Sequence, residues 1–383
     1  MMKTAETEAP PRKRRRWLRV SVIALASVLV LALGALGGAG WYFSGEVVNV
    51  DHGPDEYSLT ALAVDEKTVT LPLGKDTEKP GTWGLAWEDG QAVIGDIVEA
   101  DDETVTRSIE SVLFGELTEG TAVRIDTYAY RGDPATALGL DYENVDIPTE
   151  LGDAPAWYLP GEKATWVITV HGHNAERAET LRADEIYNVL GYPVLAVTHR
   201  NDEGAPASPS GLLSLGEDES DDIVDAVDYA LANGAEDVIL HGISMGGAIV
   251  ATAARKLAGT GEVAGLVLDS PVVDWNSTLD MQAEDRNVIA PITWTAKRIV
   301  EFRADIDLDD LDQRNFADEF DMPVMLFVDT DDHTVDHTAT LDFAEMLPPD
   351  QVTVFTTASG HTASWNEDPV AYAGALEDYL AAL

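Results

Sequence analysis

Residues 237–247 read Asp-Val-Ile-Leu-His-Gly-Ile-Ser-Met-Gly-Gly, and this stretch decides the fold class. An apolar run leads into Gly242-Ile-Ser244-Met-Gly246, and an alanine-rich stretch follows from 248 to 257. The pattern G-x-S-x-G between a strand and a helix is typical of a nucleophile on a tight, strained turn, where glycines are needed because a Cβ atom would collide with the backbone. The alternative is a glycine-rich turn with an idle serine. The strand–turn–helix context favours Ser244 as a nucleophile.

Six short apolar segments alternate with longer stretches that suit helices. Continuous apolar runs separated by helices are typical of a mostly parallel sheet that is covered by helices on both faces. We therefore expect an α/β domain over residues 160–383. Its strands are expected at 165–170, 193–198, 237–240, 263–268, 323–328 and 351–355.

A serine hydroxyl attacks efficiently only when a base removes its proton, and His361 is the histidine best placed to do so. In this arrangement the acid and the histidine follow the serine, on loops after later strands. His361 follows the expected strand 351–355 and precedes the last expected helix. Of the other histidines, His52 lies too early, and His199 and His241 lie within or at the end of strands.

The acid that should orient this histidine is harder to choose from the residues alone. Asp329, Asp331, Asp332 and Asp336 crowd the loop after the fifth expected strand. Asp269, directly after the fourth expected strand, is the reserve candidate.

A tetrahedral intermediate also needs backbone N–H groups that point at its oxyanion. We expect one from Met245, the residue after the serine, and the other from His173. His173 lies in the turn His171-Gly172-His173-Asn174, which follows the first expected strand, and Asn174 is the second choice. A His-Gly turn without that role is the alternative.

The stretch from about residue 166 to residue 379 resembles the α/β-hydrolase superfamily, especially the branch of prolyl-oligopeptidase-like and serine-aminopeptidase-like bacterial hydrolases. The matching residues are His171-Gly172, Gly242-Ile-Ser244-Met-Gly246-Gly247, Leu268-Asp269-Ser270-Pro271, Gly360-His361-Thr362, Trp365-Asn366 and Asp368-Pro369. In such proteins the acid loop often reads Gly, two residues, Asp, two residues, then Val-Pro. The loop here follows this pattern if Asp329 replaces the glycine and Asp336 the proline. The resemblance therefore implies Asp332 as the acid.

A β-rich module is expected before this domain, and a long insertion is expected within it. Residues 46–150 hold short segments rich in Thr and Val, with Asp89-Gly90 as a hairpin turn, and they predict a β-rich module. This module looks like the amino-terminal region of membrane-anchored bacterial members of the superfamily.

Residues 271–321 are too long for a usual crossover and include Trp275 and Trp294. They predict either a helical lid lined by the two tryptophans or a second helix layer on the sheet.

The amino terminus predicts a membrane span. Seven basic residues lie within 1–19, and the 24 residues 20–43 carry no charge. At 1.5 Å per residue, such a helix is long enough to cross a hydrocarbon core of about 30 Å. With the basic tail 1–19 in the cytoplasm, the catalytic domain should lie on the extracytoplasmic side of the cell membrane. A signal peptide cleaved among the small residues 34–40 is the alternative.

Composition excludes several classes of function. The 383 residues include 24 Lys and Arg against 69 Asp and Glu, a net charge of −45, so nucleic acid is not an expected partner. The chain has no Cys, which excludes disulfides, thiolate metal sites and a Cys nucleophile. His171 with His173, and His333 with His337, show no recognised ligand spacing, so neither a metal nor another cofactor is expected.

The sequence thus predicts an exported, membrane-tethered serine hydrolase that cleaves a small-molecule or lipid carboxylic ester. Ser244, His361 and Asp332 are its expected triad, working through an acyl-enzyme. The alternatives are an acyltransferase or a peptidase with the same triad, and a non-catalytic binding protein with this fold. The residues do not indicate the oligomeric state.

Overall fold

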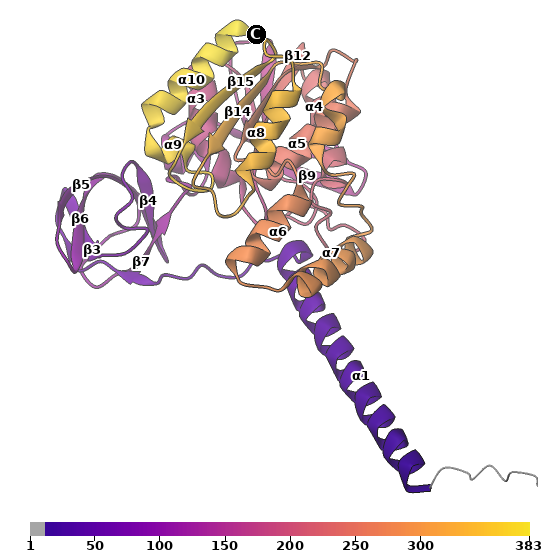
Figure 1. Cartoon of the computed structure of the whole chain (residues 1–383). Helices are drawn as coiled ribbons and strands as arrows, with labels where there is room; N and C mark the ends of the chain where they lie inside the picture. The colour runs from indigo at the N-terminus through magenta and orange to yellow at the C-terminus, as the bar shows by residue number, and fades with distance from the viewer. Residues whose placement is uncertain (1–11) are drawn as a thin grey trace, which may run out of the picture.

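A computed structural model describes residues 12–383 of the chain. Residues 1–11, which belong to the expected basic tail, lie outside the described part. The described chain has three parts: a long amino-terminal helix, a small antiparallel β module and an α/β domain (Figure 1).

The α/β domain is built on an eight-stranded sheet in the order β15-β14-β13-β12-β10-β11-β9-β8. The strands from β15 to β11 pair in parallel, whereas β9 and β8 add an antiparallel edge. This arrangement confirms the predicted fold class. The strands are β8 (Glu143–Thr149), β9 (Gly152–Leu159), β10 (Thr165–Val170), β11 (Val194–Val197), β12 (Asp237–Ile243), β13 (Val263–Asp269), β14 (Val324–Asp329) and β15 (Val352–Thr357).

The edge strands β8 and β9 shift one predicted boundary. We expected the α/β domain to begin near residue 160 and assigned 46–150 to the β module. Instead β9 pairs with β11 from Leu159↔Val194 to Ala156↔Val197, so the sheet begins at Glu143. Pro148 and Pro155 have no backbone N–H to donate, so these strands suit the edge of a sheet. The same prolines make the segment look like a loop in the sequence.

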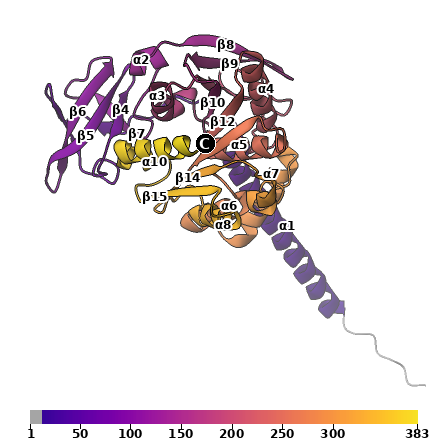
Figure 2. The same ribbon diagram turned by 90° about the horizontal axis from the view of Figure 1, so that it is seen from above.

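Helices cover both faces of this sheet. Figure 2 shows α3 and α10 on one face and α4, α5 and α8 on the other. The domain's helices are η1 (Arg177–Thr180), α3 (Leu181–Val189), α4 (Glu219–Ala232), α5 (Met245–Lys256), α6 (Trp275–Asp285), α7 (Ala290–Ala304), η2 (Gln313–Glu319), α8 (His337–Met346), α9 (Ser364–Glu367) and α10 (Pro369–Ala382).

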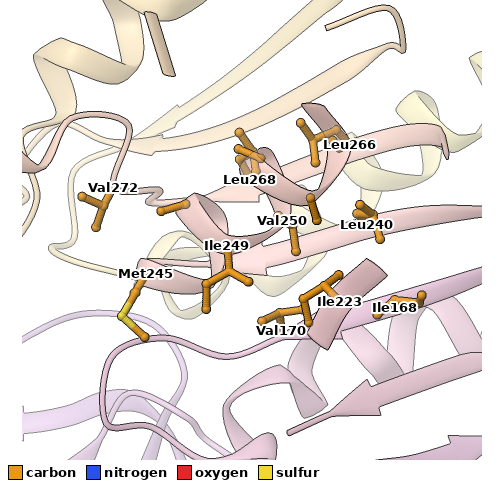
Figure 3. Close-up of a cluster of buried hydrophobic side chains, with 14 of the residues drawn as sticks. Ile168, Val170, Ile223, Leu240, Met245, Ile249, Val250, Leu266, Leu268 and Val272 are labelled. Carbon is orange, nitrogen blue, oxygen red and sulfur yellow. The ribbon is translucent and has the colours of Figure 1, made fainter. Parts of the chain in front are cut away.

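The larger core lies between the sheet and helices α4 and α5. Figure 3 shows Leu240 and Leu266 of the central strands facing Ile249 and Val250 of α5. All six residues of β14 are buried, as expected for a strand covered on both sides. Each fully buried side chain of this kind stabilises the fold by about 1.5–3 kcal/mol. This packing fixes the carboxyl ends of the parallel strands, where the candidate site lies.

The β module is a separate antiparallel sheet of seven strands in the order β1-β7-β4-β5-β6-β3-β2. A short helix, α2 (Pro134–Leu138), follows it. The hairpin between β4 and β5 turns at Glu88 and Asp89. The strands are β1 (Leu59–Thr60), β2 (Ala63–Val64), β3 (Thr68–Pro72), β4 (Trp83–Trp87), β5 (Gly90–Ala100), β6 (Thr104–Phe114) and β7 (Ala122–Asp126).

The amino-terminal helix α1 (Arg12–Val48) is longer than the expected span 20–43. It is long and apolar enough to cross a membrane, and its apolar side chains are exposed over most of its length. Its last turn enters the α/β domain, where Val48 is fully buried and its carbonyl accepts a hydrogen bond from the Leu213 N–H. Helix and domain are therefore joined by packing rather than by a flexible linker.

Candidate active site

Ser244 lies on the sharp turn between β12 and α5, as the sequence predicts. It has φ 56° and ψ −118°, a conformation that costs energy for a residue with a side chain. A Cβ atom on Gly242 would stand 2.2 Å from the Gly246 carbonyl oxygen, and one on Gly246 would stand 2.3 Å from the Val170 carbonyl oxygen. Both glycines are therefore required by close backbone approach.

His361 and Asp332 lie beside this serine. The Ser244 Oγ is 2.8 Å from His361 Nε2, and His361 Nδ1 is 2.6 Å from Asp332 Oδ2. The other carboxylate oxygen of Asp332 accepts the N–H groups of Thr334 and Val335 at 2.7 and 2.9 Å. The backbone thus holds the carboxylate so that one oxygen remains for the imidazole.

The other aspartates that the sequence offered as the acid have different partners. Asp269, the reserve candidate, accepts from the Tyr372 hydroxyl at 3.0 Å, and burial raises the pKa of its carboxyl. Asp336 caps α8 by accepting the Thr338 N–H. The Asp331 carboxylate is largely exposed and lies 3.7 Å from His333.

Asp329, which stands where the superfamily often has glycine, ties two loops of the site together. Its Oδ1 accepts the N–H of Asp331, in the acid loop, at 2.9 Å. Its Oδ2 accepts the Ser359 N–H, in the histidine loop, at 2.7 Å and the Thr357 hydroxyl at 2.9 Å. This buried carboxylate therefore helps to set the distance between Asp332 and His361.

The loop 171–174 lies against the serine. A Cβ atom on Gly172 would stand 3.1 Å from the Ser244 Cβ, and the Gly172 N–H already donates to Glu179 Oε2 at 2.7 Å. His173, the next residue, lines the same cavity as Ser244. The side chain of Asn174, our second choice for the backbone donor, hydrogen-bonds Asn49 and Asp51.

The ring of His173 connects this loop to the end of α1. Its Nε2–H donates to the Val47 carbonyl at 2.8 Å, and burial lowers the pKa of the imidazole. The side chain of Asn174 adds hydrogen bonds of 3.0 Å to the Asp51 N–H and 3.2 Å to the Asn49 carbonyl. The amino-terminal helix thus helps to hold the loop that carries the expected oxyanion donor.

His171 of this loop forms a buried pair with Asp202 that the sequence did not predict. His171 Nε2 is 2.8 Å from Asp202 Oδ2, and His199 stacks beside His171 with ring centroids 4.7 Å apart. Ligand atoms of these three residues lie within 4.8 Å of one another, so among the described residues this is the group that could hold a metal ion. In the present structure, however, the carboxylate pairs directly with His171. His173, which we considered together with His171 as a possible ligand, is not part of the group.

Asp202 changes the charge of His171. Burial alone would lower the pKa of His171, but the adjacent carboxylate outweighs it and raises the pKa to about 9. The raised value means that the pair stabilises the fold fully below the ordinary histidine pKa of about 6.5. This stabilisation is lost as the pH rises through about 9.

We therefore expect the melting temperature of the wild-type protein to fall more steeply between pH 6.5 and pH 9.5 than that of the His171→Gln variant. The matched control is His333→Gln, which alters an exposed histidine and should follow the wild-type curve. Thermal unfolding of the full chain in detergent at several pH values measures the three curves. Parallel curves for wild type and His171→Gln would show that the pair contributes no pH-dependent stability.

A largely apolar cavity of about 250 Å³ lies above Ser244. Helices α6 and α7, from the predicted insertion 271–321, form much of its wall, so this segment covers the site as a lid would. Trp275 lines the cavity and donates its indole N–H to the Leu215 carbonyl at 2.8 Å. Trp294, which we expected to line the lid, instead faces outward and is 65% exposed. The remaining apolar lining comes from Phe43, Val47, Val272, Leu279, Ala283, Val288, Ala296, Val300 and Val335.

The β module supports the histidine loop from the other side. Ala363, two residues after His361, packs into the core of the module. The Thr82 N–H donates to the Asn366 carbonyl at 2.8 Å, and the Asn366 amide donates to the Thr82 carbonyl at 2.8 Å. The segment that follows the candidate base is therefore anchored to a different domain.

Comparison with protein families now places the chain. The model of the alpha/beta hydrolase family matches residues 167–375, more than half of the chain. The chain belongs to the alpha/beta hydrolase family. A second model, a domain of unknown function (DUF8805), matches residues 60–126 of this alpha/beta hydrolase, which lie within the β module. No curated protein matches the chain.

Solved structures show the same fold. The esterase Pf2001 of Pyrococcus furiosus, in space group P21, is 20% identical with a TM-score of 0.53 and is matched over 65% of this chain and 95% of its own. Its C2221 crystal form gives 21% identity, a TM-score of 0.53 and coverage of 65% and 93%. Est1E of Butyrivibrio proteoclasticus, with ferulic acid bound, is more distant, at 17% identity and a TM-score of 0.46 over 62% of this chain and 97% of its own. The structural neighbours of this alpha/beta hydrolase thus include an esterase.

Proposed function

We propose that this alpha/beta hydrolase is a membrane-tethered serine hydrolase that cleaves carboxylic esters outside the cytoplasm. The observation that carries the proposal is the continuous chain of hydrogen bonds from Asp332 through His361 to Ser244, below a largely apolar cavity. The strained turn at Ser244 supports the same role, because it holds the hydroxyl at the floor of that cavity.

In the first half of the proposed reaction, the Ser244 Oγ attacks the ester carbonyl carbon and His361 Nε2 takes the hydroxyl proton. The Met245 N–H, in the first turn of α5, and the His173 N–H are the proposed donors to the oxyanion. When the intermediate collapses, the acyl C–O bond breaks and His361 returns the proton to the leaving alcohol.

In the second half, water hydrolyses the acyl-enzyme. His361 removes a proton from the water, the hydroxide adds to the acyl carbon, and Ser244 leaves with a proton from the imidazole. Asp332 stays ionised throughout and holds Nδ1–H, so that Nε2 is free to accept a proton from the serine. Every proton transfer uses this chain's own side chains.

Several features support a helix that stays attached. Gly40, at the end of the possible cleavage segment 34–40, lies against α7, where a Cβ would stand 2.7 Å from Thr295 Cγ2, so cleavage would remove this contact. Phe43 and Val47, which line the cavity, would then lie within a few residues of a new amino terminus. The basic residues before the apolar run favour a cytoplasmic amino terminus and an extracytoplasmic hydrolase domain.

Labelling with a fluorophosphonate tests the proposal on the full chain in detergent. We expect one adduct, on the peptide that contains Ser244, together with hydrolysis of p-nitrophenyl esters from acetate to longer acyl chains. Ser270→Ala is the matched control, because Ser270 also follows a parallel strand with φ 47° but its hydroxyl donates to Asp269 and accepts the Thr362 N–H, without a bond to the imidazole of His361; its labelling should persist.

The alternatives predict other results. Transfer of the acyl group to an added alcohol in preference to water would indicate an acyltransferase, and faster cleavage of aminoacyl amides than of esters would indicate a peptidase. A folded protein that forms no adduct would indicate a non-catalytic binding protein.

A further inference from the structure

Helix α7 presents an exposed aromatic stripe that the proposed reaction does not use. Trp294, Arg298 and Phe302 are spaced by four residues and therefore share one face, on which Trp294 is 65% and Phe302 83% exposed. Ala296 and Val300 lie on the opposite side of the helix and line the cavity above the serine. Helix α7 thus forms a wall of the cavity with one face and exposes large aromatic rings on the other.

The position of α7 along α1 defines the depth of this stripe relative to a membrane. Gly40 of α1 lies against α7, where a Cβ would stand 2.7 Å from Thr295 and 3.1 Å from Ile299. The uncharged run begins at Val20, so Gly40 lies about 30 Å along the helix from its start, which equals the thickness of a hydrocarbon core. If α1 spans the bilayer, α7 therefore contacts α1 at the edge of the hydrocarbon core. Figure 1 shows α7 lying across the upper end of α1.

At this depth, α1 and α7 are joined by hydrogen bonds between particular side chains. Arg303 of α7 donates to the Ser44 Oγ at 3.0 Å and to Asn49 Oδ1 at 2.6 Å, and its guanidinium lies 4.6 Å from the ring centre of Trp41. Trp41 and Tyr42 are themselves largely exposed. Aromatic residues flanked by arginine are typical of the membrane–water interface.

The charge of this region differs from that of the rest of the domain. Residues 44–383 carry 17 basic and 67 acidic side chains, whereas residues 286–303 carry four basic residues and one acid, Glu301. Lys297 pairs with Asp280 and Arg298 with Glu301. Because lipid phosphates repel an acidic surface, residues 286–303 can approach headgroups more readily than the acidic remainder of the domain.

The outer face of α7 also borders the cavity. A groove of about 640 Å³ beside Trp294 shares Ala283, Val288, Thr293 and Lys297 with the wall of the cavity that contains Ser244. One layer of side chains therefore separates the exposed groove from the cavity that contains Ser244.

We propose that α7 lies in the outer interface of the membrane that α1 crosses, and that the cavity takes its ester from a lipid of that leaflet. The lipid substrate rests on the proposed hydrolase function, whereas the bilayer contact of α7 does not. In the reaction, the acyl C–O bond of the lipid breaks, the acyl group passes to Ser244 and then to water, and the lipid alcohol leaves with the proton from His361.

Spin labels test the bilayer contact without reference to activity. The chain has no native cysteine, so Phe302→Cys and Val370→Cys each provide a single labelling site. Val370, on α10, is 81% exposed and is the matched control for Phe302. In the full chain reconstituted into phosphatidylcholine–phosphatidylglycerol vesicles, we expect the label at 302 to collide more with oxygen than with a water-soluble nickel chelate, and the label at 370 to show the reverse. Water-like accessibility at both positions would overturn the contact.

A charge on the same stripe tests the lipid substrate. Phe302→Glu should leave hydrolysis of soluble p-nitrophenyl acetate unchanged, because Phe302 lines neither the cavity nor the groove. It should slow hydrolysis of a phospholipid ester in the vesicles about tenfold, because an aromatic side chain is replaced by a charge at the interface. Val370→Glu should change neither rate.

The outcomes separate the two proposals. Equal rates of phospholipid hydrolysis by wild type and Phe302→Glu, or no hydrolysis of phospholipid by a wild type that cleaves the acetate, would overturn the lipid substrate. Failure of the wild type to cleave even the acetate would overturn the proposed hydrolase, while the spin labels would still decide the position of α7.

Discussion

Replacement of Ser244 by alanine is expected to lower kcat for p-nitrophenyl ester hydrolysis by about a million-fold, to the rate that oxyanion donors and binding alone supply. The reason is that the hydroxyl 2.8 Å from His361 Nε2 is the only atom in the proposed mechanism that forms the acyl-enzyme. This residual rate is still about a thousand- to ten-thousand-fold above the uncatalysed reaction, but trace esterases would mask it, so the measurement needs protein free of contaminating esterases.

Ser270→Ala is the control for this variant, since it removes another buried hydroxyl at the end of a strand while leaving Ser244 in place. The melting temperatures of both variants should stay close to that of wild type. Ester turnover by Ser244→Ala within tenfold of the wild-type rate would refute the assignment of the nucleophile.

Substitution of Asp332 by asparagine should lower kcat by about ten-thousand-fold with little change in KM. An asparagine can still accept the Thr334 and Val335 N–H groups through its oxygen, so its NH2 group would face His361 Nδ1. The imidazole would then carry its proton on Nε2, toward the serine, and could not accept the hydroxyl proton. The loss thus arises from the wrong tautomer rather than from a disrupted loop.

Two matched variants locate the acid. Asp331→Asn removes a neighbouring charge whose side chain is 66% exposed, and its kcat should stay within about twofold of wild type because exposed charges interact weakly. Asp269→Asn tests the reserve candidate, which hydrogen-bonds Tyr372 instead of His361. If Asp269→Asn lost more activity than Asp332→Asn, the acid would have to be reassigned.

The α/β sheet could be predicted because its signals are local. Strands buried on both faces are continuous apolar runs, and the expected segments 165–170 and 263–268 agree with β10 and β13 to within one residue. The turn at Ser244 is equally local, since it needs glycine two residues before and after the serine. The positions of Asp332 and His361 followed from strand order together with the family resemblance.

Other features depend on contacts between distant segments, which no local pattern records. The pairing of His171 with Asp202 joins residues from the ends of β10 and β11, and Asp202 looks like any other acid in so acidic a chain. Gly40 looks like part of a membrane span or a cleavage site, and its close approach to Thr295 becomes apparent only when α1 and α7 are seen together. The outward orientation of Trp294 likewise depends on which face of α7 meets the cavity.

The packing of α7 on α1 has a consequence for kinetics. With Gly40 lodged against α7 and Val48 buried in the domain, the hydroxyl of Ser244 would stay at a fixed height and meet its substrate by lateral diffusion in two dimensions. Turnover would then follow the mole fraction of ester among the surrounding lipids. Diluting the ester with inert lipid would slow the enzyme, whereas adding more vesicles of the same composition would not change its rate.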